Sequence, residues 1–381
     1  MESVQKKSGA AISDENRLSG IDVLRLFAAL SVVTLHVTMW SGFNMPPRLC
    51  LNGVIWQFVG RSSLLCIPLF GMLSGYLLAD REIRFRKLLP LWVLILFYSI
   101  SGSIAGKLLG YQNFIAWKYA FFPILTTRWW YITAYFVLYA FLPILNRGLR
   151  QLSAREALFF GSILLLCCVS NPFSKKLARI ISPDFSVFNL IWLYIVGACI
   201  RKLKDSIDSS MEKPFRAAQL LFKRNILVSA IILDELLSFI ILCLNDSSVK
   251  FNLNFMNDNF YAPLNMIPAL ALMFYFCNHD APCFPKLFRF AAPFSLDIYV
   301  IHMHPCLGYP VFSAIYRIDI AGTNGAAILI YIWLRVLLIM VFSLLAAFVT
   351  HIVFDKLHIK QICDSLAEHF AQYLAHLFRT V

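Results

Sequence analysis

The segment from Arg17 to His36 places ionisable groups in an apolar stretch long enough to cross a membrane. Arg25 and His36 are eleven positions apart, so on an α-helix they lie within about 20° of one face and about 16 Å apart along the axis. Asp22 lies within about 40° of that face. Ionisable side chains are costly inside a bilayer, and a deep histidine can exchange protons near neutral pH. Two interpretations stay open: a functional site, or helix anchoring by Asp22 and Arg25 beside a histidine buried in the core.

The composition places the chain among polytopic membrane proteins. Of its 381 residues, 59% are hydrophobic and only 14% are charged, whereas a soluble domain carries about 25% charged residues. We expect an all-α fold with about ten membrane-spanning helices. The expected spans are 20–41, 54–79, 88–106, 128–146, 156–171, 185–200, 225–244, 260–277, 287–306 and 325–354. The segment 114–126 is shorter and contains Pro123, which favours an interfacial or re-entrant piece.

The net charge of +13 comes from Lys and Arg residues in the short connections between these spans. This arrangement indicates membrane topology and contacts with anionic lipids, and it argues against nucleic acid as a partner. The excess of cations on one side predicts that both termini are cytoplasmic; the connection 172–184 is an exception to the rule. We expect a cytoplasmic tail at 1–19, a transmembrane domain at 20–354 and a cytoplasmic amphipathic helix at 355–381. The ten cysteines lack metal-ligand spacing, so no metal site is predicted.

A cluster of cations follows the second expected span, at Arg81, Arg84, Arg86 and Lys87. A positive-inside topology signal would explain its charge. The alternative is a clamp for a phosphorylated cytoplasmic cofactor, because guanidinium groups bind phosphate in a bidentate manner.

Three other groups of polar residues interrupt apolar spans. Ser295, Tyr299 and His302 share one helical face, which is either a polar packing seam or the second wall of a cavity. Asp297 lies off that face, so we expect it to be dispensable. Arg128 and Trp130 begin a span, where they form an interfacial belt or contact a sugar or phosphate. The adjacent acids at 234 and 235 could relay protons, pair with Arg335 or be neutral through burial.

These residues together resemble the acyltransferase 3 family of membrane acyltransferases. The resemblance rests on Asp22-Xaa-Xaa-Arg25 followed by ten residues and His36, Ser74-Gly75-Tyr76, the pair Arg81-Xaa-Xaa-Arg84, the span from Trp130 to Pro143, and Ser295-Leu-Asp-Ile-Tyr299-Val-Ile-His302. Within the family the chain looks most like the enterobacterial common antigen O-acetyltransferase group. It departs from the family pattern at Leu26 and Asp297, where glycine is more usual.

The resemblance implies an O-acetyltransferase of the bacterial inner membrane, active in polysaccharide biosynthesis. It would use acetyl-CoA or another acyl-CoA as a donor co-substrate, with no tightly bound cofactor, and acylate a lipid-linked or exported glycan. His36 would act as general base, with Arg25 and Asp22 beside it, and transfer through an acyl-imidazole is a competing scheme. The basic cluster would bind the donor, and Arg128, Trp130, Ser295, Tyr299 and His302 would bind the acceptor. A transporter or flippase of a polar substrate is the alternative function.

Overall fold

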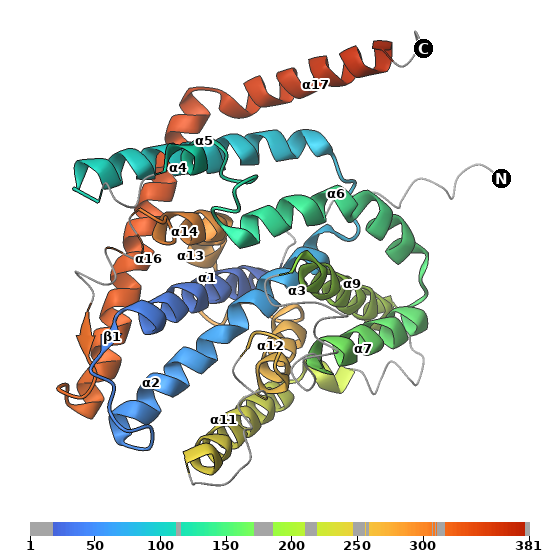
Figure 1. The fold of residues 1–381 in the computed structure, drawn as a ribbon. Coiled ribbons are helices and arrows are strands. Elements are labelled where there is room, and N and C mark those ends of the chain that lie inside the picture. Colours follow the sequence, from blue (N-terminus) through green and yellow to red (C-terminus); the bar gives the residue numbers. More distant parts are fainter. Residues whose placement is uncertain are drawn as a thin grey trace.

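The computed structural model describes residues 18–111, 116–170, 186–209, 219–246, 256, 259–306, 308, 310 and 317–377. Most of the expected tail at 1–19, the connection 172–184 and the last four residues lie outside this description. The described chain is almost entirely helical (Figure 1). The α-helices are α1 (Ser19–Trp40), α2 (Leu51–Ser62), α3 (Cys66–Leu78), α4 (Leu88–Leu108), α5 (Trp117–Phe121), α6 (Trp130–Gln151), α7 (Ala154–Ser170), α9 (Val187–Ser209), α11 (Arg224–Asp246), α12 (Pro263–Phe276), α13 (Pro285–Ala291), α14 (Ser295–His302), α16 (Gly325–Lys356) and α17 (Ile359–Leu377).

Each of the ten expected spans contains a helix, but fewer have the length and composition of a complete membrane crossing. Within the described residues, six stretches meet both conditions: Ser19–Trp40, Leu51–Leu78, Leu88–Leu108, Trp130–Gln151, Arg224–Leu244 and Gly325–Lys356. The apolar helix α12 is shorter. The protein is therefore polytopic and α-helical, whereas ten complete crossings are not established by these criteria.

The expected span 287–306 is wrong as a single helix. It consists of α13, a 3-10 turn from Ala292 to Phe294, and α14, which ends at His302. Pro293 lies in the turn and Pro305 follows α14. Proline lacks the N–H that a continuous helix would use, so the chain is interrupted near both positions. Among its described residues, the segment expected at 114–126 contains the α-helix α5, which is five residues long.

Helix α1 is the central helix of the bundle. In its apolar window 78% of the residues are buried inside the protein, against 22% in the corresponding windows of α4 and α11. It packs against α2, α3, α14 and α16 (Figure 1). Because protein surrounds α1, its ionisable side chains can be placed away from lipid.

Helices α3 and α9 approach so closely that their backbones touch. A Cβ atom at Gly75 would lie 1.8 Å from the carbonyl oxygen of Tyr194, and one at Gly197 would lie 1.9 Å from that of Met72. Real atoms cannot approach so closely, so both positions need glycine. Gly75 in Ser74-Gly75-Tyr76 therefore has a packing role.

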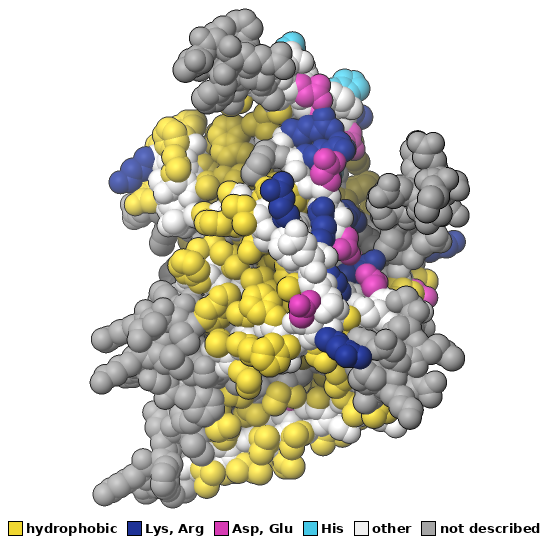
Figure 2. All heavy atoms as spheres, turned by 90° about the vertical axis from the view of Figure 1, so that its right-hand side faces the viewer, with side chains coloured by type: hydrophobic (Ala, Val, Ile, Leu, Met, Phe, Trp, Pro, Cys, Tyr) yellow, Lys and Arg dark blue, Asp and Glu magenta, His cyan; other side chains and the backbone are white. Residues whose placement is uncertain are grey.

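Two peripheral features complete the fold. The two-residue strands β1 (Gly42–Phe43) and β2 (Ile318–Asp319) form a parallel pair that joins the end of α1 to the segment before α16. Helix α17 packs on α4 and α16 (Figure 1) and exposes apolar side chains such as Ile362 and Phe370. Figure 2 shows Lys, Arg, Asp and Glu side chains in a stripe beside a hydrophobic surface.

Candidate functional site

A pair of buried histidines joins two helices in the interior of the bundle. Nδ1 of His36 on α1 lies 3.1 Å from Nε2 of His302 on α14. His36 is 8% exposed and His302 is 6% exposed. The ring of Trp40, one turn along α1, lies 4.8 Å from the His36 ring, centroid to centroid. The two residues come from segments that were identified separately in the sequence and that folding brings together.

The hydrogen bonds of this pair determine the tautomer of each neutral ring. Nδ1 of His302 lies 2.5 Å from the carbonyl oxygen of Ile298. A carbonyl can only accept, so Nδ1 of His302 carries the proton and its Nε2 holds a lone pair. Nδ1 of His36 must then donate to that lone pair. Nε2 of His36 is consequently an unprotonated nitrogen, as a general base requires.

The other residues of the predicted α14 face are buried beside His302. Ser295 is 3% exposed and Tyr299 is 7% exposed. The Tyr299 ring packs edge-on against Tyr131 of α6, with centroids 6.1 Å apart. This stripe of α14 therefore faces neighbouring helices.

Asp22 and Arg25 lie near the opposite end of α1 from Trp40. Asp22 is fully buried, and Arg25 is half-buried within electrostatic reach of Tyr135 on α6. The beginning of α1 is held by the Asp280 carboxylate, which accepts hydrogen bonds from the Ser19 amide at 2.9 Å and hydroxyl at 2.8 Å. These bonds lower the pKa of Asp280. The start of α1 is thus fixed to the α12–α13 connection.

The predicted donor cluster lies in the loop between α3 and α4. Arg81, Arg84 and Lys87 are exposed, whereas Arg86 is partly buried. Arg84 donates to the Glu82 carboxylate at 2.9 Å, and this bond lowers the pKa of Glu82. Arg86 pairs with Glu368 of α17. Two of the four cations thus have acidic partners. The sequence of the cluster alone does not show these pairings.

One face of α6 holds this loop in place, and sequence reasoning missed it. Tyr139 donates to the Arg84 carbonyl at 3.2 Å, and Asn146 donates to the Leu78 carbonyl at 2.9 Å. Arg150 donates to the Arg81 carbonyl at 2.9 Å. The spacing of these three donors, seven and then four residues, is the available signal, because it places them on one helical face.

A cavity of about 280 Å³ lies beside the loop. Charged and polar side chains at its wall come from the end of α3, α6 and α9, and they include Asp80, Arg150, Lys202 and Asp205. Arg201 on α9 binds Asp205 at 2.8 Å and lies over the Tyr76 ring. We call the α3–α4 loop with its cations at 81, 84, 86 and 87 the basic loop. The cavity and the basic loop together form a polar surface at one end of the bundle.

Arg128 faces protein groups, which favours a role other than an interfacial belt. Its Nη2 lies 3.0 Å from Ser103 Oγ, 3.2 Å from His304 Nε2 and 3.5 Å from Cys306 Sγ. Trp130 is partly buried and packs edge-on against Tyr131. His304, which lies outside the predicted α14 stripe, therefore belongs to a second polar cluster with Arg128.

The structure gives Asp297, which the sequence predicts to be dispensable, two hydrogen-bond partners. Asp297 does lie off the His302 face, but it is 4% exposed and accepts a hydrogen bond from Tyr98 of α4 at 2.8 Å. Nε2 of His351 on α16 lies 3.0 Å from the same oxygen. Removing a buried carboxylate with two partners leaves those partners unsatisfied, so loss of Asp297 should be costly.

The acids of α11 lie next to α2. Glu235 accepts a hydrogen bond from Ser62 at 3.0 Å. Arg335, a partner considered for them, donates to the carbonyls of Tyr331 and Arg317. Across the residues that the structure describes, no cluster of three or more His, Cys, Asp or Glu could hold a metal ion.

The fold and the histidine pair define a polytopic membrane protein with a buried proton-accepting group. The chain matches the acyltransferase domain of the acyltransferase 3 family over residues 18–352, and it belongs to that family. It is therefore a membrane-bound acyltransferase, which decides between the enzyme and the transporter in favour of the enzyme. Neither the curated proteins nor the solved structures contain a match to the chain.

Proposed function

We propose that the protein is an O-acetyltransferase of a bacterial inner membrane. It would transfer the acetyl group of cytoplasmic acetyl-CoA to a hydroxyl of a cell-envelope polysaccharide or a lipid-linked sugar. The observation that carries this proposal is the His36–His302 hydrogen bond, which leaves the lone pair of His36 Nε2 available for a hydroxyl proton.

In the proposed reaction, His36 Nε2 removes the proton of the acceptor hydroxyl. The hydroxyl oxygen attacks the thioester carbonyl carbon, a C–O bond forms, the C–S bond breaks, and the CoA sulfur takes the proton from the imidazolium. His302 accepts the Nδ1–H of His36 throughout and so orients the ring. A buried site favours this proton exchange because little water competes for the base.

The donor would bind at the end of the bundle that carries the basic loop. Arg81, Arg84, Arg86 and Lys87 supply cations for its phosphates, and the neighbouring 280 Å³ cavity supplies room. Arg25 would bind the diphosphate or polarise the thioester carbonyl, oriented by Asp22. The rise of about 16 Å from Arg25 to His36 is comparable to a pantetheine arm of about 15–20 Å.

The acceptor would lie near the buried aromatic and polar side chains around the histidine pair. Ser295 and Tyr299 border His302 on α14, and Tyr131 connects Tyr299 to Trp130. Arg128 lies in the adjoining cluster with His304. These groups supply hydrogen-bond donors and aromatic surfaces, the two features that a sugar ring can use.

Mass spectrometry of envelope glycans from cells with and without the gene tests this proposal. We expect a glycan whose mass rises by one acetyl group only when the gene is present, and radiolabel from acetyl-CoA should enter the same glycan in isolated membranes. A glycan profile that is identical in the two strains, with no label incorporated, would overturn the proposal. Another acyl-sized mass difference would reassign the donor.

A further inference from the structure

Arg128 is a partly buried cation in a cluster whose chain segments contain no acid. Its Nη2 donates to Ser103 Oγ at 3.0 Å and to Cys306 Sγ at 3.5 Å. Its Nε is buried and, among the described residues, has no acceptor. The two stretches of chain that supply the cluster hold no Asp or Glu, from 83 to 155 and from 298 to 318. Neither stretch can therefore neutralise the guanidinium with a carboxylate.

His304 does not act as an acceptor for this guanidinium. The Cys306 amide donates to Nδ1 of His304 at 3.2 Å, so in the neutral ring Nε2 carries the proton. That proton is donated to the Ser99 carbonyl, 3.2 Å away. The 3.2 Å contact between His304 Nε2 and Arg128 Nη2 thus brings two donors together. Protonation of His304 would add a second positive charge, so the cluster attracts an anion in either state.

The turn before α6 holds Arg128 in a strained piece of backbone. Thr127 has a φ of +50°, a left-handed conformation that is unfavourable for a β-branched residue. The Arg128 amide donates to the Pro123 carbonyl at 2.9 Å, and the Thr133 hydroxyl donates to the Ile124 carbonyl at 2.9 Å. Strain of this kind persists only where the surrounding structure imposes it, and it is concentrated at functional sites.

The surroundings of Arg128 are typical of a membrane–water interface. Helix α5 precedes the turn and packs on α4 (Figure 1). It exposes Trp117 and Tyr119, and the following turn exposes the apolar side chain of Leu125. Tryptophan and tyrosine prefer the level of the lipid head groups, where lipid phosphates lie. A phosphate carried on a lipid would thus reach Arg128 with its hydrocarbon chain against these side chains.

The cluster is joined to the segment that follows His302. The Trp129 indole donates to the Met303 carbonyl at 3.2 Å, and its ring packs edge-on against His304 with centroids 5.7 Å apart. A sugar attached to a phosphate on Arg128 would therefore lie beside the chain that continues from the histidine pair.

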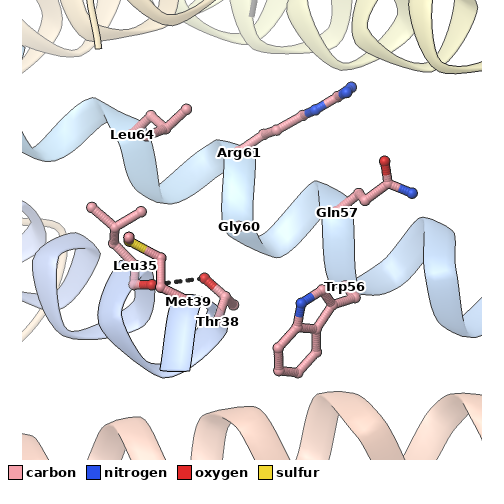
Figure 3. A pocket seen from close by; sticks show the side chains of 8 residues that line it. All are labelled: Leu35, Thr38, Met39, Trp56, Gln57, Gly60, Arg61 and Leu64. Carbon is pink, nitrogen blue, oxygen red and sulfur yellow. Dashed lines mark hydrogen bonds between the residues drawn. The ribbon is translucent and has the colours of Figure 1, made fainter. Parts of the chain in front are cut away.

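Arg61 of α2 is the contrasting case, a cation that already has protein partners. It lines a separate cavity of about 290 Å³, and its side chain extends away from the labelled residues of α1 (Figure 3). It donates to the Ser238 carbonyl at 3.3 Å and lies within electrostatic reach of Glu235. A carboxylate beside Arg61 would repel a phosphate, so Arg61 is a matched control for Arg128.

We propose that Arg128 binds the phosphate of a lipid-linked glycan, and that this glycan is the acceptor. The proposal rests on the proposed function and narrows its two acceptor classes to the lipid-linked one. A guanidinium can donate two parallel hydrogen bonds to one phosphate group. Lys107 lies four residues after Ser103 on the same face of α4 and supplies a second, exposed cation.

Binding of a lipid phosphate tests the site without relying on catalysis. The purified protein in phosphatidylcholine nanodiscs is titrated with a tritium-labelled long-chain polyprenyl phosphate and, in a second arm, with the corresponding polyprenol. We expect the wild type to bind the phosphate about 10- to 100-fold more tightly than the alcohol, because hydrogen bonds to a charged group are strong. An excess of phosphatidylglycerol should not displace it.

Arg128→Gln should reduce this preference to about threefold or less, and Arg128→Lys, which keeps the charge and loses the planar fork, should retain part of it. Arg61→Gln should match the wild type. Thermal unfolding reports whether each variant is folded. If Arg128→Gln does not fold, Arg128→Lys decides, because a purely structural arginine would leave the preference of a folded lysine variant unchanged.

Three results would overturn the site. These are equal binding of the phosphate and the alcohol by the wild type, a preference that both Arg128 variants leave unchanged, and displacement by phosphatidylglycerol. Acetyl transfer to a lipid-free glycan together with equal binding would overturn the site and leave the proposed function standing. An Arg128-dependent preference in a protein that transfers no acetyl group would support the phosphate site and overturn the proposed reaction.

Discussion

The histidine pair and the basic loop are two polar regions that differ in burial and in their partners. His36 and His302 are buried and hydrogen-bond to each other at 3.1 Å. The loop cations are largely exposed, and Arg84 and Arg86 have carboxylate partners. The pair is already hydrogen-bonded in the structure, whereas in the proposed reaction the loop would exchange a carboxylate partner for a donor phosphate. Substitutions at the pair should therefore affect the rate of transfer, and substitutions in the loop should affect donor binding.

The largest effect is expected for His36→Ala. Loss of a general base typically lowers a rate by about 10²- to 10⁴-fold, and we expect kcat to fall in that range while KM for acetyl-CoA stays within twofold. Radiolabel transfer in membranes with matched protein levels measures both. His279→Ala is the control, because His279 stacks on Tyr275 away from the pair. Transfer at the wild-type rate would remove His36 from the chemistry.

A smaller loss is expected for His302→Ala. The variant deprives the buried Nδ1–H of His36 of its acceptor, at a cost of about 1–3 kcal/mol, equivalent to a roughly 5- to 150-fold lower kcat. His302→Gln offers a side-chain oxygen as acceptor and should recover part of the rate. If His302→Gln and His302→Ala were equally impaired, orientation through this hydrogen bond would not explain the role of His302.

In the loop, Arg84→Ala should raise KM for acetyl-CoA by about 3- to 10-fold with little change in kcat, because an exposed charge contributes modestly. The effect should shrink in high salt. Arg289→Ala, which removes another exposed arginine, in α13, is the control.

Glu82→Gln sharpens this test because it should act in the opposite direction. It removes the carboxylate that Arg84 binds, so KM for acetyl-CoA should fall. Unchanged donor kinetics in both variants would argue against a phosphate clamp at Arg84.

The smallest effect is expected for Glu368→Gln in α17. The variant releases Arg86 from a surface ion pair worth about 0.2–1 kcal/mol, so KM for acetyl-CoA should fall by roughly 1.5- to 5-fold. Asp364→Asn makes the same charge change on the same helix and serves as the control. Equal effects of the two variants would indicate a general charge effect rather than competition for Arg86.

Long apolar segments were predictable because the hydropathy of a segment depends only on its own residues. The expected span 20–41 corresponds to α1 at Ser19–Trp40, and 225–244 lies within α11. The broken segment at 287–306 was not foreseen, although Pro293 and Pro305 are visible in the sequence. Hydropathy measures whether a segment is apolar enough to cross, whereas the interruption depends on backbone hydrogen bonding.

The candidate site was predictable only in parts. Helical periodicity placed Arg25 and His36 on one face and placed Ser295, Tyr299 and His302 on another. It could not show that His36 meets His302, because 266 positions separate them and their contact depends on how α1 and α14 pack. The pairing of Arg86 with Glu368 was hidden for the same reason.

The backbone contact between α3 and α9 has a mechanical consequence. Helices slide past one another when side chains separate them, but at Gly75 and Gly197 carbonyl oxygens occupy the space that side chains would fill. The two helices should therefore move together as one rigid unit. The basic loop follows directly after α3, and Arg201 lies on α9, so both belong to this unit. If the proposed donor site opens, the opening would then come from movement of α6 and α17 relative to this rigid unit.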